Sequence, residues 1–218
     1  MKKYFFPATI ILFLIAAESC CKVQKEDLFN GKDLSNWTIF LKNPDANPDS
    51  VFSVADGVIN VAGQPFGYLR TKKEYNNYKL HVEYRWVGTP TNSGIFLNTS
   101  GEDKVWPRCM ECQLANLKAG DIILMNVGTG ISVRDTSFVV ESSERPYFAV
   151  KKSGDSSEKP AGEWNSVDIL CETNNLEITV NGVLQNKGSN MTQTSGSICL
   201  QSEGGPLQFR NVYIEPLK

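Results

Sequence analysis

The sequence predicts an all-β protein, a single-domain antiparallel sandwich of many short strands. Its apolar and polar residues alternate with the period of two expected of strands, and turn-forming residues separate these runs at short intervals. No stretch of ten or more residues combines helical periodicity with capping residues. The clearest alternation runs over residues 78–86, with aromatic and aliphatic side chains on one face and polar side chains on the other.

Segments rich in Gly, Pro, Asn and Asp set the limits of the other predicted strands. Residues 52–61 predict a hairpin, because Asp56-Gly57 supplies the positive φ angles of a tight turn. A second hairpin is expected across Asn174-Asn175, and loops are expected at 42–50 and 152–162. The remaining predicted strands are residues 37–40, 68–71, 109–114, 121–127, 131–134, 138–141, 147–151, 167–172, 176–181, 198–202 and 207–214.

The N-terminus predicts an export signal over residues 1–19. Two lysines precede an apolar run over residues 4–17, which is short for a membrane span. Cys20 follows and predicts a bacterial lipoprotein, cleaved and lipidated there; cleavage before Cys21 and ordinary secretion are the alternatives. We therefore expect a lipid-bearing tether over 20–27 and the domain over 28–218. The expected location is the cell envelope, in the outer membrane or facing the periplasm, with the membrane as a partner.

Charge and cysteine content exclude several classes of function. The formal net charge is −2 and no basic stripe is present, so nucleic acid is not an expected partner. Cys109 and Cys112 form a C-x-x-C, but in a strand they point to opposite faces, which is poor geometry for a bridge or a zinc site. Cys171 and Cys199 are expected to be small buried apolar residues.

Two predicted strands carry unusual polar faces. One places Glu83 beside Arg85, and the other places Glu111 beside Gln113. Such sets can bind and polarise a polyol, although routine cross-strand pairs would use the same residue types.

Seven segments follow the pattern of one known family in order. The chain resembles the 3-keto-disaccharide hydrolase family, associated with 3-keto-glucoside 1,2-lyase and 3-keto-2-hydroxy-glucal hydratase activities. The resemblance covers essentially the whole predicted domain and implies a concanavalin-A-like jelly roll whose concave sheet faces a sugar. The segments are LFNGKDLSNW (28–37), VADGVINV (54–61), TNSGIFLN (91–98), ECQL (111–114), KPAGEWNSVDI (159–169), VNGV (180–183) and GSICLQSEGGPLQFRNVYIEPL (196–217).

The implied substrate is a small sugar with a ketone at C3, which changes the chemistry needed. Most glycosidases use two carboxylates across the bond, and the Glu-x-Asp-x-x-Glu pattern of laminarinase-type jelly rolls is absent here. A C3 ketone acidifies the C2 proton, so one base can form an enolate and the C1 substituent then leaves. Water can add back across the double bond. The site needs a base, a donor for the enolate oxygen and an acid for the leaving group.

Three residues are predicted to carry these roles. Glu111 is the expected base, and Arg85 is the expected donor to the enolate or a sugar oxygen. Glu203 is the candidate proton donor, although the family pattern has His there in many relatives, and a glutamate needs a raised pKa for that role. The candidate substrate-binding residues are His81, Glu83, Asn92, Trp106, Gln113 and Gln201.

Simpler roles remain open for several of these residues. Arg85 and Glu111 could form ion pairs, and Asn92 could make a turn. Trp106 could stack on a sugar, although a large aromatic before a strand is usually core. Asp121 is a weak metal candidate and more simply a strand-entry aspartate. No ligand spacing demands a cofactor, and a divalent cation could serve as a Lewis acid.

Three functions are compatible with these observations. The first is a lyase or hydrolase for 3-keto-glycosides, either oxidised disaccharides or plant glycosides, with Glu111, Arg85 and Glu203 around one sugar. The second is a non-catalytic carbohydrate-binding lipoprotein module that uses the same sheet. The third is a structural lipoprotein domain whose polar faces are merely solvated.

Overall fold

Two antiparallel sheets lie face to face in the computed structural model, which describes residue 1 and residues 24–217. Apart from one 3-10 turn, η1 (Pro48–Ser50), the regular elements are all strands. They are β1 (Glu26–Asp27), β2 (Trp37–Leu41), β3 (Phe52–Ala55), β4 (Val58–Val61), β5 (Gly67–Thr71), β6 (Tyr78–Trp86), β7 (Gly94–Ser100), β8 (Arg108–Gln113), β9 (Ile122–Met125), β10 (Gly130–Val133), β11 (Thr136–Val139), β12 (Tyr147–Val150), β13 (Asn165–Glu172), β14 (Asn175–Val180), β15 (Val183–Ser189), β16 (Ser197–Ser202) and β17 (Leu207–Pro216).

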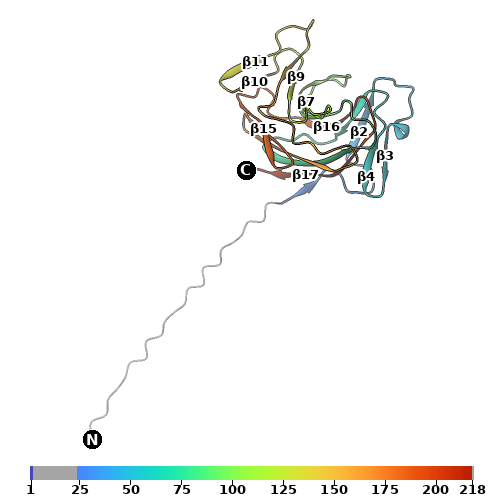
Figure 1. Ribbon diagram of the computed structural model, residues 1–218, viewed down its shortest axis with the longest axis horizontal. Helices are drawn as coiled ribbons and strands as arrows, with labels where there is room; N and C mark the ends of the chain where they lie inside the picture. The colour runs from blue at the N-terminus through green and yellow to red at the C-terminus, as the bar shows by residue number, and fades with distance from the viewer. Residues whose placement is uncertain (2–23, 218) are drawn as a thin grey trace.

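The larger sheet has ten strands and the smaller has seven. The larger runs β11-β10-β15-β14-β13-β6-β17-β4-β3, with β1 paired to β17, and the smaller runs β12-β9-β8-β7-β16-β5-β2. In Figure 1, β7 and β16 of the smaller sheet lie over β17 of the larger. Non-consecutive neighbours such as β7-β16 and β13-β6 close the two layers into a jelly-roll sandwich, as predicted.

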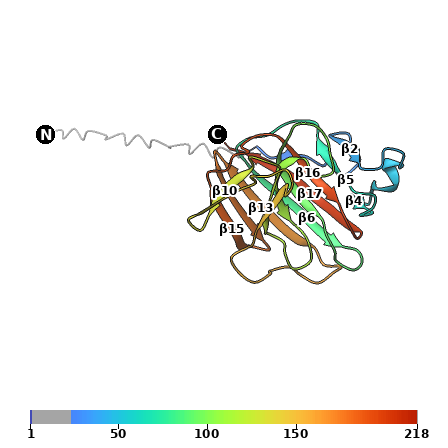
Figure 2. The same ribbon diagram turned by 90° about the horizontal axis from the view of Figure 1, so that it is seen from above.

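Strand alternation decides which side chains enter the core between the sheets. On β6 the side chains from Tyr78 to Trp86 at even positions are buried in the main hydrophobic cluster, whereas the odd positions point out. On β8, Met110 and Cys112 join the same cluster, so Cys109 and Glu111 point to the other side. Figure 2 shows β6 between β13 and β17 in the larger sheet.

A second, smaller apolar cluster lies on the outer face of the seven-stranded sheet. It consists of Tyr68, Phe96, Cys109, Ile123, Met125 and Cys199, with Phe40 packed against it. The predicted opposite orientation of the C-x-x-C pair is therefore confirmed, because Cys109 and Cys112 belong to different clusters. All four cysteines in the described domain are free and buried.

Most predicted strands agree with the structure, and both hairpins form, although the turn of the second lies at Thr173-Asn174 rather than at Asn174-Asn175. Asp56 and Gly57 both have positive φ, at 51° and 75°, as the tight turn between β3 and β4 requires. Strands β7 and β15 were not among the predicted strands. Residues 26–27, expected in the tether, instead form β1 against β17.

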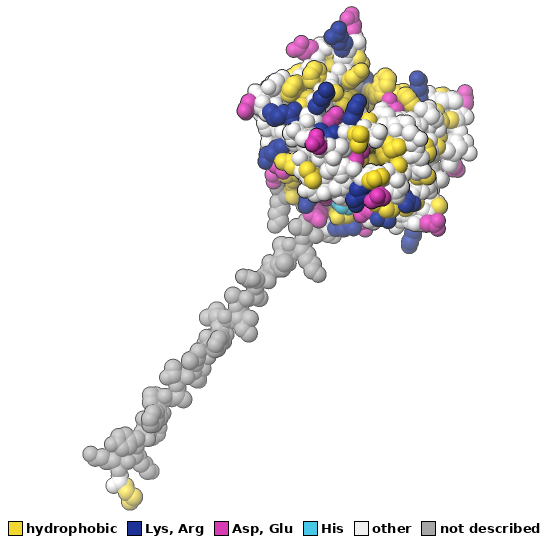
Figure 3. All heavy atoms as spheres, in the orientation of Figure 1, with side chains coloured by type: hydrophobic (Ala, Val, Ile, Leu, Met, Phe, Trp, Pro, Cys, Tyr) yellow, Lys and Arg dark blue, Asp and Glu magenta, His cyan; other side chains and the backbone are white. Residues whose placement is uncertain are grey.

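The predicted export signal and the lipidation site at Cys20 lie outside the described residues. No helix within residues 24–217 has the length and apolar character needed to cross a membrane. On the visible face of the domain, acidic and basic side chains are interspersed (Figure 3).

Candidate functional site

A cavity of about 300 Å³ opens on the outer face of the seven-stranded sheet. Strands β8 and β9 supply its floor, and the segments that precede β7, β8, β12 and β17 supply its walls. One part of the lining is polar and the other is apolar or aromatic, which suits a polyol. The lining residues are Asn92, Trp106, Glu111, Gln113, Ile123, Met125, Pro146, Tyr147 and Glu203.

Glu111 lies in the centre of β8 with its side chain turned away from the core. Its neighbours in register are Phe96 on β7 and Ile123 on β9, so two apolar side chains flank the carboxyl group. Glu111 is only 2% exposed, and its Oε1 atom has no hydrogen-bond partner. Burial, followed by the nearby charge of Glu203, raises the pKa of Glu111 well above its usual range.

Gly94 makes room for the Glu111 side chain. A Cβ atom at Gly94 would lie 1.9 Å from Glu111 Oε1 and 2.6 Å from Glu111 Cδ. No residue with a side chain can occupy this position on β7 while Glu111 keeps its present orientation. The glycine of the TNSG segment is therefore part of the site.

Glu203 reaches the same cavity from the turn between β16 and β17. Side chains of Trp106, Asn92 and Gln201 hydrogen-bond to its carboxylate, and Gln201 Nε2 donates to Oε2. Burial nevertheless raises the pKa of Glu203, while these three hydrogen bonds oppose the rise. The two glutamates thus differ in one respect: Glu203 receives donors that stabilise a negative charge, and Glu111 receives none.

The turn that carries Glu203 packs closely against the segment before β7. The backbone N–H of Gly205 donates to Thr91 Oγ1, and a Cβ at Gly204 would lie 2.4 Å from the same oxygen. The two glycines permit this close backbone approach. It holds Glu203 beside Asn92.

Three buried oxygen atoms around the cavity have no hydrogen-bond partner: Asn92 Oδ1, Glu111 Oε1 and Gln201 Oε1. Buried polar atoms in folded proteins are almost always paired, because an unpaired one costs about 1–3 kcal/mol. Three such atoms at one cavity indicate a place prepared for a ligand that carries hydroxyl donors. Asn92 lies in the lining of the cavity, beside Glu203.

Trp106 lies at the rim of the cavity and is 47% exposed, so the reading of Trp106 as a core residue is wrong. The loop that carries it is held at both ends. Asp103 contacts Arg70 Nη1 and the Tyr68 hydroxyl at 2.8 Å each, and Asn126 Nδ2 donates to the Trp106 carbonyl at 2.9 Å. The fixed loop keeps the indole over open space, where it can stack on a sugar ring.

Tyr147 is a lining residue that the sequence analysis did not identify. It begins β12, is 64% exposed and stands with Pro146 at the apolar side of the cavity. Its strand was predicted, but nothing in a short run of four strand residues distinguishes a surface tyrosine from one at a site. The pairing of β12 with β9 brings it there.

The structure separates Arg85, Glu83 and His81 from Glu111 and Glu203. All three lie on β6 and point outward from the ten-stranded sheet, on the opposite side of the sandwich from the cavity. The expectation that Arg85, Glu111 and Glu203 surround one sugar is therefore wrong. The error has a simple cause: alternation identifies the outward face of each strand, but does not show that two strands belong to different sheets.

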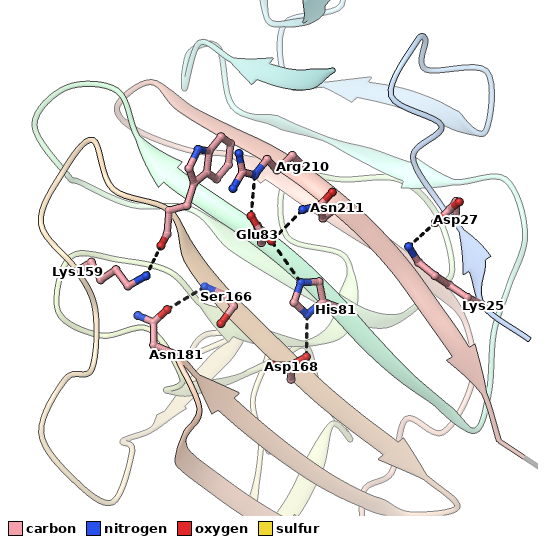
Figure 4. Close-up of polar contacts among 11 residues, drawn as sticks. Lys25, Asp27, His81, Glu83, Lys159, Ser166, Asp168, Asn181, Arg210 and Asn211 are labelled. Atoms are coloured by element: carbon pink, nitrogen blue, oxygen red, sulfur yellow. Dashed lines mark hydrogen bonds and ion pairs between the residues drawn. The ribbon is translucent and has the colours of Figure 1, made fainter. Parts of the chain in front are cut away.

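His81 and Glu83 instead take part in a network of polar contacts with residues of the neighbouring strands (Figure 4). Glu83 accepts from Arg210 Nε at 2.6 Å and from Asn211 Nδ2 at 2.8 Å, and His81 Nδ1 lies 2.8 Å from Asp168 Oδ1. Burial alone would raise the pKa of Glu83, but the hydrogen bonds from Asn211 and Arg210 hold it below its usual value.

Arg85 also has its contacts on that side. Its Nε donates to Gln208 Oε1 at 2.7 Å, and its guanidinium lies 4.7 Å from the ring centre of Trp164. Asn165, close to Trp164 in the sequence, has a structural role, because its side chain accepts from Lys159 N and from Asn181 Nδ2.

Asp121 has a structural role at the entry to β9. It is largely buried, and its Oδ1 accepts from the backbone N–H of Lys152 at 2.9 Å. Within the described residues, no group of three or more His, Cys, Asp or Glu side chains is arranged to hold a metal ion.

The two sheets define a class by fold, the jelly-roll β-sandwiches, and solved structures share it. A candidate glycosyl hydrolase from Parabacteroides distasonis matches with a TM-score of 0.65 and 22% identity, over 89% of this chain and 94% of that one. The carbohydrate-binding module CBM66 from Bacillus subtilis matches with 0.56 and 8%, over 83% and 95%. The β-glucanase of Bacillus licheniformis matches with 0.54 and 13%, over 88% and 97%. At these identities the likeness establishes the fold.

The sequence narrows the class to one family. The model of the 3-keto-α-glucoside-1,2-lyase-like domain matches residues 24–215, so the chain belongs to this family, and the resemblance noted in its motifs is confirmed. A comparison with curated proteins gives no match.

Proposed function

We propose that this protein cleaves 3-keto-glycosides by elimination, with Glu203 as the base and Glu111 as the acid. The observation that carries the proposal is the unequal pair of carboxyl groups at one cavity: three side chains hydrogen-bond to Glu203, whereas Glu111 is buried and its Oε1 atom has no partner among the described residues. These roles are the reverse of those expected from the sequence. An acid–base pair requires environments that push the pKa values of its two carboxyl groups apart.

The reaction follows from these two groups. The Glu203 carboxylate takes the C2 proton, and the electron pair of that bond moves toward the C3 oxygen to form an enolate. The enolate then expels the C1 substituent, whose oxygen takes the proton of the Glu111 carboxylic acid. A C1–C2 double bond remains next to the ketone, and water can add across it with net hydrolysis.

The surroundings of each group suit its role. Hydrogen bonds from Trp106 and Asn92 favour an ionised Glu203, as a base must be. Burial between Phe96 and Ile123 raises the pKa of Glu111, which favours the protonated form that an acid needs. Trp106 and Tyr147 would hold the sugar and its leaving group at the rim.

The test compares a chromogenic aryl 3-keto-glucoside with its unoxidised counterpart. We expect cleavage of the keto sugar alone, with the rate lowered roughly 10²–10⁴-fold in Glu203→Gln and in Glu111→Gln. Glu83→Gln, on the opposite face, is the matched control and should keep wild-type activity. Saturable sugar binding without cleavage of either compound would instead favour a carbohydrate-binding module.

The pH profile separates the two roles. Cleavage should require an ionised Glu203, which gives the acid limb, and a protonated Glu111, which gives the alkaline limb. Because both pKa values are raised, both limbs should lie above the usual carboxyl range. Glu111→Gln should remove the alkaline limb; its loss in Glu203→Gln instead would restore the roles expected from the sequence.

The cell-envelope location remains a proposal as well. Metabolic labelling with a radioactive fatty acid should label the full chain and should not label Cys20→Ser. Labelling that survives this change and disappears in Cys21→Ser would place the lipid one residue later.

A further inference from the structure

We propose that the Gln113 carboxamide donates the hydrogen bond that stabilises the C3 oxygen as the enolate forms. The inference rests on the proposed elimination and fills the role for which Arg85 was expected. Arg85 cannot fill it, because it lies on the other sheet and is bound to Gln208 and Trp164.

The orientation of the Gln113 amide is fixed by the backbone. Its Oε1 accepts from the N–H groups of Leu114 and Ala115, both at 2.9 Å, as the chain turns at the end of β8. A flipped amide would set its NH₂ group against two backbone donors, so only one orientation is compatible with this turn. The NH₂ group is therefore held on the side away from the turn.

That NH₂ group is free to serve a ligand. Among the described residues it has no acceptor, and the side chain lines the cavity next to Glu111, two positions earlier on the same face of β8. Its partner in register is Gly94, which has no side chain to cover it. A donor aimed into the cavity beside the acid is thus in place before substrate arrives.

The other amides near the cavity are occupied differently. Asn92 and Gln201 both hydrogen-bond to Glu203, and each leaves a buried oxygen unpaired. Their free atoms are acceptors and suit sugar hydroxyls, whereas an enolate oxygen needs a donor. Gln113 is the cavity amide whose free group is a donor.

A preorganised donor stabilises charge that develops during the reaction without reorganising at that moment. In the proposed chemistry the C2 proton goes to Glu203 and the electron pair goes to the C3 oxygen. Because C2 and C3 are adjacent, one donor near the acid–base pair can serve that oxygen. Its loss should lower the rate of enolate formation about 10²–10³-fold.

Gln113→Glu isolates the donor. A carboxylate keeps an oxygen for the two backbone N–H groups and removes the NH₂ group. Gln113→Met removes the donor without adding charge and has a similar volume. The matched control is Gln208→Glu on the opposite face, where the side-chain oxygen likewise accepts a hydrogen bond, from Arg85.

The readout is deuterium exchange at C2 of a 3-keto sugar that has no leaving group at C1. We expect about 10²–10³-fold slower exchange in both Gln113 variants and in Glu203→Gln, and little change in the control Gln208→Glu. Thermal unfolding of each variant should show that the fold is retained, and Gln113→Met decides the outcome should Gln113→Glu not fold.

The outcomes separate this inference from the proposed function. Wild-type protein that neither exchanges C2 nor cleaves keto sugars would overturn both. Wild-type exchange that persists at full rate in both Gln113 variants would overturn the role of Gln113 and leave the elimination intact.

Discussion

The outer faces of the two sheets carry the same kinds of side chain, but the glutamate is hydrogen-bonded on one face and has an unpaired oxygen on the other. On the ten-stranded sheet, Glu83 is bound by Arg210 and Asn211, and Arg85 by Gln208. On the seven-stranded sheet, Glu111 is buried and its Oε1 has no partner. Both faces contain a glutamate on a central strand and a nearby tryptophan, so composition does not distinguish them.

The pKa values of the two glutamates are shifted in opposite directions. The pKa of Glu83 is lowered, so the folded state favours its charge and gains stability from it. The pKa of Glu111 is raised, so the folded state disfavours its charge. A fully paired face supports the fold, and an unpaired face holds free energy that a ligand can recover.

The largest effect is expected from filling the space over Gly94, which the Glu111 carboxyl group occupies. Gly94→Ala places a Cβ 1.9 Å from Glu111 Oε1, so the carboxyl group must move. We expect activity on keto sugars to fall about 10²-fold or more, because small displacements of a reacting group have effects of this size. Gly88→Ala is the control, since its Cβ would meet only Pro206 Cγ at 3.7 Å. Equal rates in the two variants would show that the position of Glu111 does not matter.

The pH dependence of stability should have opposite signs on the two faces. Because the pKa of Glu111 is raised, its contribution is fully present below the unfolded-state pKa and is lost as pH rises through the folded-state value. Glu111→Gln should therefore raise the free energy of unfolding at pH 8 by about 1–3 kcal/mol. Because the pKa of Glu83 is lowered, its contribution is present above the unfolded-state pKa and is lost as pH falls through the folded-state value.

Glu83→Gln should accordingly lower the free energy of unfolding at neutral pH by about 1 kcal/mol, and this difference should disappear in acid. Urea unfolding at several pH values between 3 and 9 measures both effects. A Glu111→Gln variant that loses stability as steeply as wild type when the pH rises above the usual carboxyl range would contradict the assignment of a raised pKa to Glu111.

The smallest expected effect is the difference in sugar binding between variants of Trp106 and Trp164. Trp106→Ala should weaken sugar binding by about 0.5–1.5 kcal/mol, or roughly 2- to 13-fold, because a stacking surface is lost. Trp164→Ala should leave binding unchanged, since Trp164 contacts Arg85 and Arg210 on the other face. Titration with the keto sugar measures both.

Trp106→Phe separates stacking from hydrogen bonding. It keeps a ring at the rim and removes the N–H that favours an ionised Glu203. Binding should therefore be largely retained, while the acid limb of the pH profile moves to higher pH. An unmoved acid limb would show that Glu203 does not depend on Trp106.

The sequence by itself determined the fold class and most of the strands. Alternation over residues 78–86 identified which β6 side chains are buried, and Asp56-Gly57 identified a hairpin turn, because both signals are local. Motifs in register established the family. The sequence also pointed to five of the residues that line the cavity, and to Gln201, which hydrogen-bonds to Glu203. The five are Asn92, Trp106, Glu111, Gln113 and Glu203.

Only the tertiary structure decided which polar faces belong together. Period-two alternation predicts that Arg85 and Glu111 both point outward. Strand pairing then puts them on opposite sides of the sandwich, because β6 pairs with β13 and β17 in one sheet and β8 pairs with β7 and β9 in the other. The roles of the two glutamates were decided in the same way. Burial and hydrogen bonding depend on neighbours that are distant in the chain, so the pKa of a glutamate cannot be predicted from the residues next to it in the sequence.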